Sequence, residues 1–205
     1  MNKKLKYYSF ALTLAGLMGL SAQSAIAASF TLNAFTGDDA KMFVDVTNLS
    51  PVGVEIKTGF TNDSANTGDI TGFWLGLKDN SFDPAQILNT HITVLGLPTG
   101  VTYSFKRDML NLGNGINLNG AGDYALTFDL DIGLAQQDRR SNDIIRSLTI
   151  NIATTGLQAA HFDAFGARLQ TTTGTSGSSK LAGSATPVPE PVSYTHLTLP
   201  TSDLV

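Results

Sequence analysis

The sequence has no cysteine, little charge and very little glutamate. The absence of cysteine among 205 residues excludes a disulfide scaffold, a thiol nucleophile and a cysteine-ligated metal site. Charged residues make up 15% of the chain, against roughly 25% in an ordinary globular protein. The formal net charge of −4 argues against the basic face that a nucleic-acid-binding protein needs. Glutamate occurs only as Glu55 and Glu190, so the paired carboxylates of a glycoside hydrolase are in short supply.

What the sequence does have, in its middle part, is alternation of apolar and polar residues. In residues 124–132, leucine, phenylalanine and isoleucine alternate with threonine and aspartate. Residues 101–106 and 148–152 repeat the pattern, and Gly, Asn, Asp or Pro marks the breaks. Sheets with one apolar face each must cover one another. We therefore expect an all-β fold over residues 28–170, an antiparallel β-sandwich of about eight or nine strands.

Two stretches of this domain favour short helices. Residues 83–89 begin with Asp83 and Pro84, which suit an N-cap and a first helical turn. Residues 156–165 carry a leucine and two alanines at helical spacing, which is typical of a short crossover. We therefore expect one or two short helices within the β domain.

The first 27 residues are organised like a secretory signal peptide. Three lysines form the positive n-region, and residues 9–20 form an uncharged apolar stretch. Ala25 and Ala27 give the small-x-small cleavage pattern, so the mature chain would begin at Ala28. A membrane helix is the alternative, but the apolar run is shorter than the about 20 residues that span a bilayer. We expect export through the secretion translocon and cleavage by signal peptidase.

The composition changes after the expected β domain. Residues 171–187 consist almost entirely of Thr, Gly, Ser and Ala, which bury too little apolar surface to fold. We therefore expect a linker over this range. It leads into a Pro-rich tract made of Val188, Pro189, Glu190 and Pro191. Proline fixes φ and removes a donor, so this tract stays extended.

Residues 192–205 do not continue this pattern. Residues 192–201 match, in order, the translation of a common transposase-type sequencing adapter. In the same frame the next three residues depend on the adapter index, and Val205 precedes a stop codon. We therefore expect residues 192–205 to derive from an adapter, the alternative being a natural C-terminal tail.

The Pro-Glu-Pro tract, after a Ser/Thr/Gly-rich linker in an exported chain, resembles the start of the PEP-CTERM sorting region of Gram-negative bacteria. Residues 142–150, 165–170 and 178–183 add to the likeness, since Asn-Asp-Ile-Ile, Phe-Gly-Ala-Arg-Leu-Gln and Ser-Ser-Lys-Leu resemble the ending of one group of these proteins. In the family, an apolar transmembrane helix and a basic cluster follow the tract, and an exosortase processes the region.

The resemblance implies a cellular location and does not imply an enzymatic reaction. It implies delivery to the cell surface or extracellular matrix of a Gram-negative bacterium, with transient membrane attachment through the helix that follows the tract. That helix and its basic cluster are not in this sequence, and the adapter interpretation accounts for their loss. The residues that the resemblance assigns to recognition by the exosortase are Val188, Pro189, Glu190 and Pro191.

The supply of catalytic side chains is small. Outside residues 192–205 the only histidines are His91 and His161, and neither lies in a zinc-helix or nucleophile-elbow motif. His91 falls at a polar phase of an expected strand, which favours a surface histidine. His161 lies beside Phe162 and Asp163, which favours a turn-capping or half-buried role. We expect no catalytic residue and no enzymatic activity.

Aspartate makes calcium the one metal to consider, because calcium takes six to eight oxygen ligands. Asp129 and Asp131 share one face of an expected strand, about 6.6–7 Å apart by strand rise. That spacing is too long for one ion without further ligands, so solvated carboxylates are favoured over a calcium site. Other candidate ligands lie in expected loops: Asp38, Asp39, Asp63, Asp69, Asp79 and Asp83. We expect no cofactor, with calcium as the alternative.

The aromatic residues favour a core over a ligand platform. Trp74, the only tryptophan, has apolar neighbours on both sides, which is typical of a buried strand. Tyr103 and Tyr124 fall at the apolar phase of their strands. The Gly-rich residues 111–122 lack the Lys-Ser/Thr ending of a phosphate loop and are expected to form a long turn. The function we expect is display of an exported surface protein; the alternative is a carbohydrate-binding or calcium-binding module that adheres to exopolysaccharide.

Overall fold

The computed structural model describes residues 26–120, 127–136 and 144–184. Within these ranges the chain forms twelve strands: β1 Ile26–Gly37, β2 Lys41–Asn48, β3 Val54–Phe60, β4 Asp69–Leu77, β5 Ile92–Leu95, β6 Val101–Arg107, β7 Asn111–Gly113, β8 Ile116–Asn117, β9 Leu130–Gln136, β10 Ser147–Ile152, β11 Phe162–Gln170 and β12 Ser178–Ser184. The same ranges contain short 3₁₀ turns: η1 Pro84–Gln86, η2 Asn89–His91 and η4 Ala159–His161. The predicted all-β fold is confirmed.

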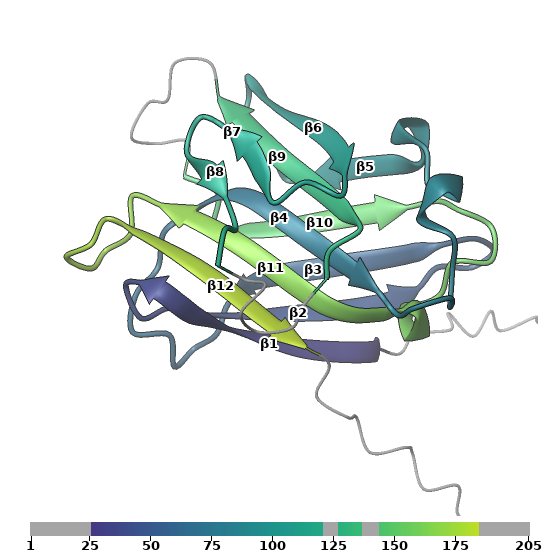
Figure 1. The fold of residues 1–205 in the computed structure, drawn as a ribbon, viewed down its shortest axis with the longest axis horizontal. Helices are drawn as coiled ribbons and strands as arrows, with labels where there is room; N and C mark the ends of the chain where they lie inside the picture. Colours follow the sequence, from purple (N-terminus) through teal and green to yellow (C-terminus); the bar gives the residue numbers. More distant parts are fainter. Residues whose placement is uncertain (1–25, 121–126, 137–143, 185–205) are drawn as a thin grey trace, which may run out of the picture.

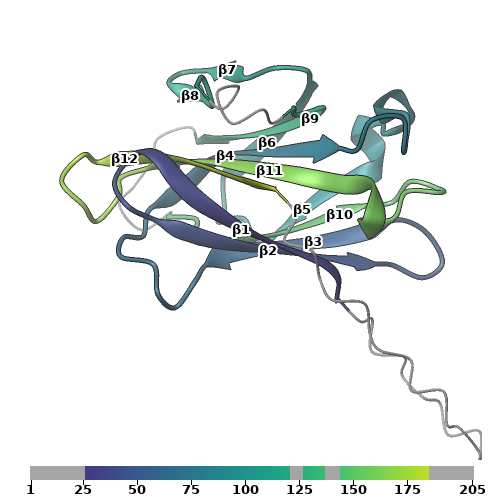
Figure 2. The ribbon, with the colours of Figure 1, turned by 60° about the horizontal axis from the view of Figure 1, so that its bottom comes forward.

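Ten of these strands form one continuous antiparallel sheet in the order β5-β10-β3-β2-β1-β12-β11-β4-β9-β6. The sheet folds over so that the half from β5 to β1 covers the half from β12 to β6 (Figures 1 and 2). The edge strands meet where the Tyr103 hydroxyl of β6 donates a 2.7 Å hydrogen bond to the Ile92 carbonyl of β5. The two layers of the expected sandwich therefore belong to a single, nearly closed sheet.

The core lies between the two layers. Phe165 of β11 is fully buried near its centre, with Phe30 at a ring-centroid distance of 4.6 Å in an edge-to-face arrangement. Phe73 lies 5.7 Å and Phe162 5.6 Å from the same ring. Aromatic pairs at these distances add to the stabilisation from burial alone. The alternating residues of β6 and β10 put apolar side chains into this core, as the sequence predicted.

The two remaining strands, β7 and β8, form a hairpin on the outer surface. The β7–β8 hairpin lies over the layer that contains β4 and β9 (Figure 2). Its turn has positive φ at Asn114 (51°) and Gly115 (76°), which suits the asparagine-glycine turns of tight hairpins. The Gly-rich stretch that was expected as a long turn thus contributes a hairpin that adds a partial third layer.

The interpretation of residues 171–187 as a linker is wrong for Ser178–Ser184. These residues form β12, which lies inside the sheet between β1 and β11. Leu181 is fully buried in the core and Ser179 is buried as well. Small residues fit here because β12 has neighbours on both sides: a Cβ on Gly183 would lie 2.1 Å from the Thr31 carbonyl oxygen. The amino-acid composition of residues 178–184 did not predict this strand, because its pairing with β1 and β11 depends on residues distant in sequence.

The helix expected over residues 156–165 is also wrong for most of its length. Only η4 is helical, and β11 begins immediately after it at Phe162. The backbone groups of this stretch pair with β4 and β12, which overrides the helical spacing of its apolar residues. Within residues 83–89 only Pro84–Gln86 is helical, as the three-residue turn η1. Asp83 is its N-cap and accepts a 2.9 Å hydrogen bond from the Ala85 N–H.

Several predictions fall on residues that the structure does not describe. They include the signal peptide up to Ala25, Tyr124, the sorting residues Val188, Pro189, Glu190 and Pro191, and residues 192–205. The expected cleavage position between Ala27 and Ala28 lies near the start of β1. Among the described residues, no helix is long and apolar enough to cross a membrane.

Candidate functional site

The outer face of β4, β9 and β11 carries several polar side chains with buried atoms that lack a hydrogen-bond partner in the described residues. The β7–β8 hairpin and its flanking residues cover this face and form a second apolar cluster of four buried residues: Trp74, Leu118, Phe128 and Ala164. Gly166 of β11 makes the cover possible, because a Cβ there would lie 2.3 Å from a Leu118 methyl carbon. As a result β4 is buried on both faces.

Trp74 belongs to this second cluster and not to a sugar-binding platform. Its side chain is fully buried, which confirms the prediction of a core tryptophan. Its indole N–H donates a 2.9 Å hydrogen bond to the Met109 carbonyl, in the segment that leads from β6 to β7. The tryptophan therefore fixes the covering segment to the sheet.

Asp131 is fully buried beside Trp74, so the expectation of a solvated carboxylate is wrong for this residue. The polar phase of β9 faces the covering segment instead of water. Oδ2 of Asp131 accepts a 2.7 Å hydrogen bond from the Met109 N–H, while Oδ1 of Asp131 is buried with no partner in the described ranges. Burial, with the charges of Asp108 and Asp129, raises the pKa of Asp131 to about 7.

Asp129 lies two residues before Asp131, just ahead of β9, and is half-buried. Its carboxylate accepts a 2.7 Å hydrogen bond from the backbone N–H of Leu77 on β4. The two carboxylates thus bind different backbone groups, one at Leu77 and one at Met109. Over residues 26–120, 127–136 and 144–184, no group of three His, Asp or Glu side chains could hold a metal ion. Calcium at Asp129 and Asp131, the alternative to the expected absence of a cofactor, stays untested.

The acidic character of this face extends to Asp163 on β11. Its Oδ1 is buried and lacks a hydrogen-bond partner among the residues described. Burial, followed by the charge of Asp129, raises the pKa of Asp163 above its ordinary value. The sequence signal for this cluster was the polar phase of residues 127–131; what it could not show was the hairpin that covers it.

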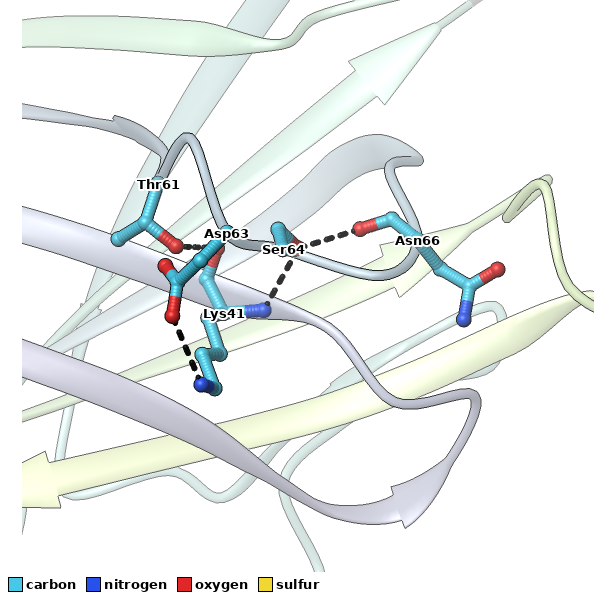
Figure 3. Close-up of polar contacts among 5 residues, drawn as sticks. All are labelled: Lys41, Thr61, Asp63, Ser64 and Asn66. Atoms are coloured by element: carbon cyan, nitrogen blue, oxygen red, sulfur yellow. Dashed lines mark hydrogen bonds and ion pairs between the residues drawn. The ribbon is translucent and has the colours of Figure 1, made fainter.

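Four of the loop aspartates that were considered as calcium ligands bind parts of the protein itself: Asp38, Asp63, Asp69 and Asp83. Asp63 pairs with Lys41 at 2.9 Å, and this pair belongs to a network that ties the β3–β4 loop to the start of β2 (Figure 3). In that network the Ser64 hydroxyl accepts a 2.8 Å hydrogen bond from the Lys41 N–H and donates one of 2.6 Å to the Asn66 carbonyl. The polar groups of the network satisfy one another.

Asp38 closes the hairpin between β11 and β12. One carboxylate oxygen accepts a hydrogen bond from the Thr172 hydroxyl, and the other accepts a 2.9 Å bond from the Ser176 N–H. These bonds lower the pKa of Asp38 below its ordinary value. Asp69 is also tied to the backbone, because it accepts a 2.9 Å hydrogen bond from the Ile145 N–H.

The two histidines in the described part of the chain both cap turns. His161 ends η4, where its Nδ1 accepts a 3.2 Å hydrogen bond from the Gln158 N–H and its ring stacks on Phe82 at 5.6 Å; its predicted turn-capping role is confirmed. His91 ends η2 instead of lying within a strand. Its Nδ1 lies 2.9 Å from the Thr154 hydroxyl oxygen, in addition to a 3.3 Å contact with the Leu88 N–H. Each histidine thus has a hydrogen-bond partner within the protein.

Comparison with protein-family models, with curated proteins and with solved structures found no match for this chain. The functional interpretation therefore depends on the residues and contacts described above.

Proposed function

We propose that this chain is an exported protein whose β domain is displayed at the cell surface or in the extracellular matrix of a Gram-negative bacterium, without catalysing a reaction. The observation that carries the proposal is the use of its titratable groups. His161, Asp38 and Asp129 each accept hydrogen bonds from the protein's own backbone. Groups used in this way position turns and loops, as a display domain requires.

The arrangement of the chain ends supports display. β1 and β12 are antiparallel neighbours, with Asn33 opposite Ala182 and Gly37 opposite Ser179. The start of β1 and the end of β12 therefore lie at the same end of the sheet. Attachment through residues that follow β12 would leave the opposite end, with the Asp38-bound hairpin, directed away from the attachment point.

In this proposal the two ends of the sequence carry the signals for export and sorting. Signal peptidase cleaves after Ala27, with Ala25 as the other small residue of its recognition pattern. The exosortase binds Val188, Pro189, Glu190 and Pro191. The secretion translocon and the exosortase are therefore the partners that delivery requires.

The test uses the gene with its genomic C-terminus and replaces Pro189, Glu190 and Pro191 together by alanine. We expect the altered protein to accumulate in the inner-membrane fraction, whereas the unaltered protein reaches the surface. A Thr175→Ala variant is the control, because Thr175 is exposed and belongs to the hairpin at the other end of β12. Equal surface display of the alanine variant would count against the sorting role.

A second candidate function is adhesion to exopolysaccharide. It is favoured by a pair of cationic side chains, Arg168 and Lys180, on the outer face of β11 and β12. This pair favours a carbohydrate-binding module over a calcium-binding one, because cations attract the acidic groups of a polymer and repel a metal ion.

A further inference from the structure

Arg168 and Lys180 lie directly opposite each other on the neighbouring strands β11 and β12. Their sequence neighbours Ala167, Leu169 and Leu181 are fully buried in the core between the layers. Because side chains alternate along a strand, Arg168 and Lys180 both project from the outer face. Both are half-buried, so part of each side chain stays accessible.

This pair differs from the two cations of the described residues that form ion pairs. Lys41 binds Asp63 at 2.9 Å, and Lys57 binds Glu55 at 2.7 Å. Among the described residues Arg168 has no ion pair, and its Nε is buried without a hydrogen-bond partner. Like charges directly opposite each other on a sheet are destabilising. The pair therefore carries positive charge that the described part of the protein does not neutralise, in a chain with a net charge of −4.

Lys180 is held near Arg168 by a neutral group. Its Nζ donates a 2.8 Å hydrogen bond to the Asn119 carbonyl oxygen, which leaves two further N–H donors of the ammonium group. Burial, followed by the charge of Arg168, lowers the pKa of Lys180 below its ordinary value. An anion between the two side chains would relieve this repulsion.

The surroundings of the pair favour a ligand that also carries neutral polar groups. Gln170 and Ser178, the next outward-facing pair along β11 and β12, lie opposite each other. On the other side of β11, Gly72 of β4 lies opposite Arg168, and the Trp74 ring and Ile116 fill the space above it. Arg168 is thus covered towards β4, while the side towards Lys180 carries polar groups.

We infer that Arg168 and Lys180 bind the carboxylate of a hexuronate unit in an acidic extracellular polysaccharide, with Gln170 and Ser178 beside the sugar hydroxyls. The two terminal nitrogens of a guanidinium match a planar carboxylate through parallel N–H···O bonds, and the ammonium adds a point charge. The site lies on the β domain, apart from the sorting tract. Its biological use depends on the proposed export, since the polymer is extracellular.

The test measures binding of the purified full chain to an oligogalacturonate by isothermal titration calorimetry, with a neutral maltodextrin and inorganic phosphate as separate ligands. We expect binding of the oligogalacturonate and none of the maltodextrin. Arg168→Gln should weaken binding by about tenfold or more, since hydrogen bonds to charged groups contribute roughly 1.5–3 kcal/mol. Lys180→Gln should weaken it severalfold. Lys57→Gln, which removes an exposed charge from β3, should leave binding unchanged.

Three results would overturn the assignment: equal affinity of the wild type for the neutral oligomer, unchanged affinity of both site variants, or equal loss in Lys57→Gln. Tight binding of phosphate alone would overturn the polysaccharide part and leave a free-anion site. Thermal melting checks that each variant folds. If Arg168→Gln does not fold, Lys180→Glu serves as the second probe, and the proposal requires that it abolish binding of the oligogalacturonate. Because these measurements use purified protein, their failure is distinct from a failure of export or sorting.

Discussion

Trp74 and Asp131, directly opposite each other on β4 and β9, hold the same overlying residue by its two backbone groups. The Trp74 indole N–H donates to the Met109 carbonyl, and the Asp131 carboxylate accepts from the Met109 N–H. The Met109 side chain itself is 40% exposed, so the attachment is made through its backbone. This double contact fixes the segment that covers the outer face.

The first prediction concerns Asp131 and pH. Its pKa is raised to about 7 when folded, so its protonated form is favoured in the folded state. The resulting stability is fully present below the unfolded pKa near 3.8 and is lost as pH rises through 7. We expect the wild-type free energy of unfolding to fall from pH 4 to pH 8 through this group, by on the order of 2 kcal/mol once solvent screening is allowed for. Asp131→Asn should lack that fall when both proteins are unfolded in urea across this range.

The control for this experiment is Asp39→Asn, because Asp39 is exposed. It should follow the wild-type pH profile. Parallel profiles for the wild type and Asp131→Asn would show that Asp131 does not titrate in this range.

The second prediction concerns Trp74. Trp74→Phe removes the hydrogen bond to the Met109 carbonyl and leaves a void in the second apolar cluster. We expect a loss of about 2–4 kcal/mol in the free energy of unfolding. Because Trp74 is the only tryptophan, unfolding should be followed by circular dichroism instead of fluorescence. Leu95→Ala, at a 44% exposed position of an edge strand, should change stability by much less. An equal effect of the two substitutions would contradict the buried role of the indole.

The third prediction concerns β12. Leu181 is fully buried, so Leu181→Ala should cost about 2–5 kcal/mol of stability. Thr175→Ala in the adjoining hairpin should stay within about 0.5 kcal/mol of the wild type, because Thr175 is exposed. Denaturant unfolding of both variants checks this. A neutral Leu181→Ala would mean that residues 178–184 are a linker after all.

The sequence predicted the fold class because the alternation in β6 and β10 is local information. It also predicted the core position of Trp74 from its apolar neighbours, and the N-cap role of Asp83 from the Asp83–Pro84 pair. These features depend on residues that are adjacent in sequence, which is what a pattern can show.

The features that the sequence did not predict depend on distant contacts. Ser178–Ser184 looks like linker sequence until β1 and β11 are placed on either side. The polar phase of β9 predicts solvated aspartates until Met109 and Leu118 cover it. Arg168 and Lys180 are twelve residues apart, and only the register of β11 and β12 makes them a pair. Burial of a polar residue is a tertiary property, and alternation alone cannot reveal it.

The account depends most on the claim that the β domain is exported and displayed. The most direct test is to produce the protein from its gene with the genomic C-terminus, fractionate the cells, and determine the N-terminal residue of the protein in each fraction. If the β domain is exported, the protein at the cell surface or in the medium begins at Ala28. Protein that stays in the cytoplasm and still begins at Met1 would contradict it.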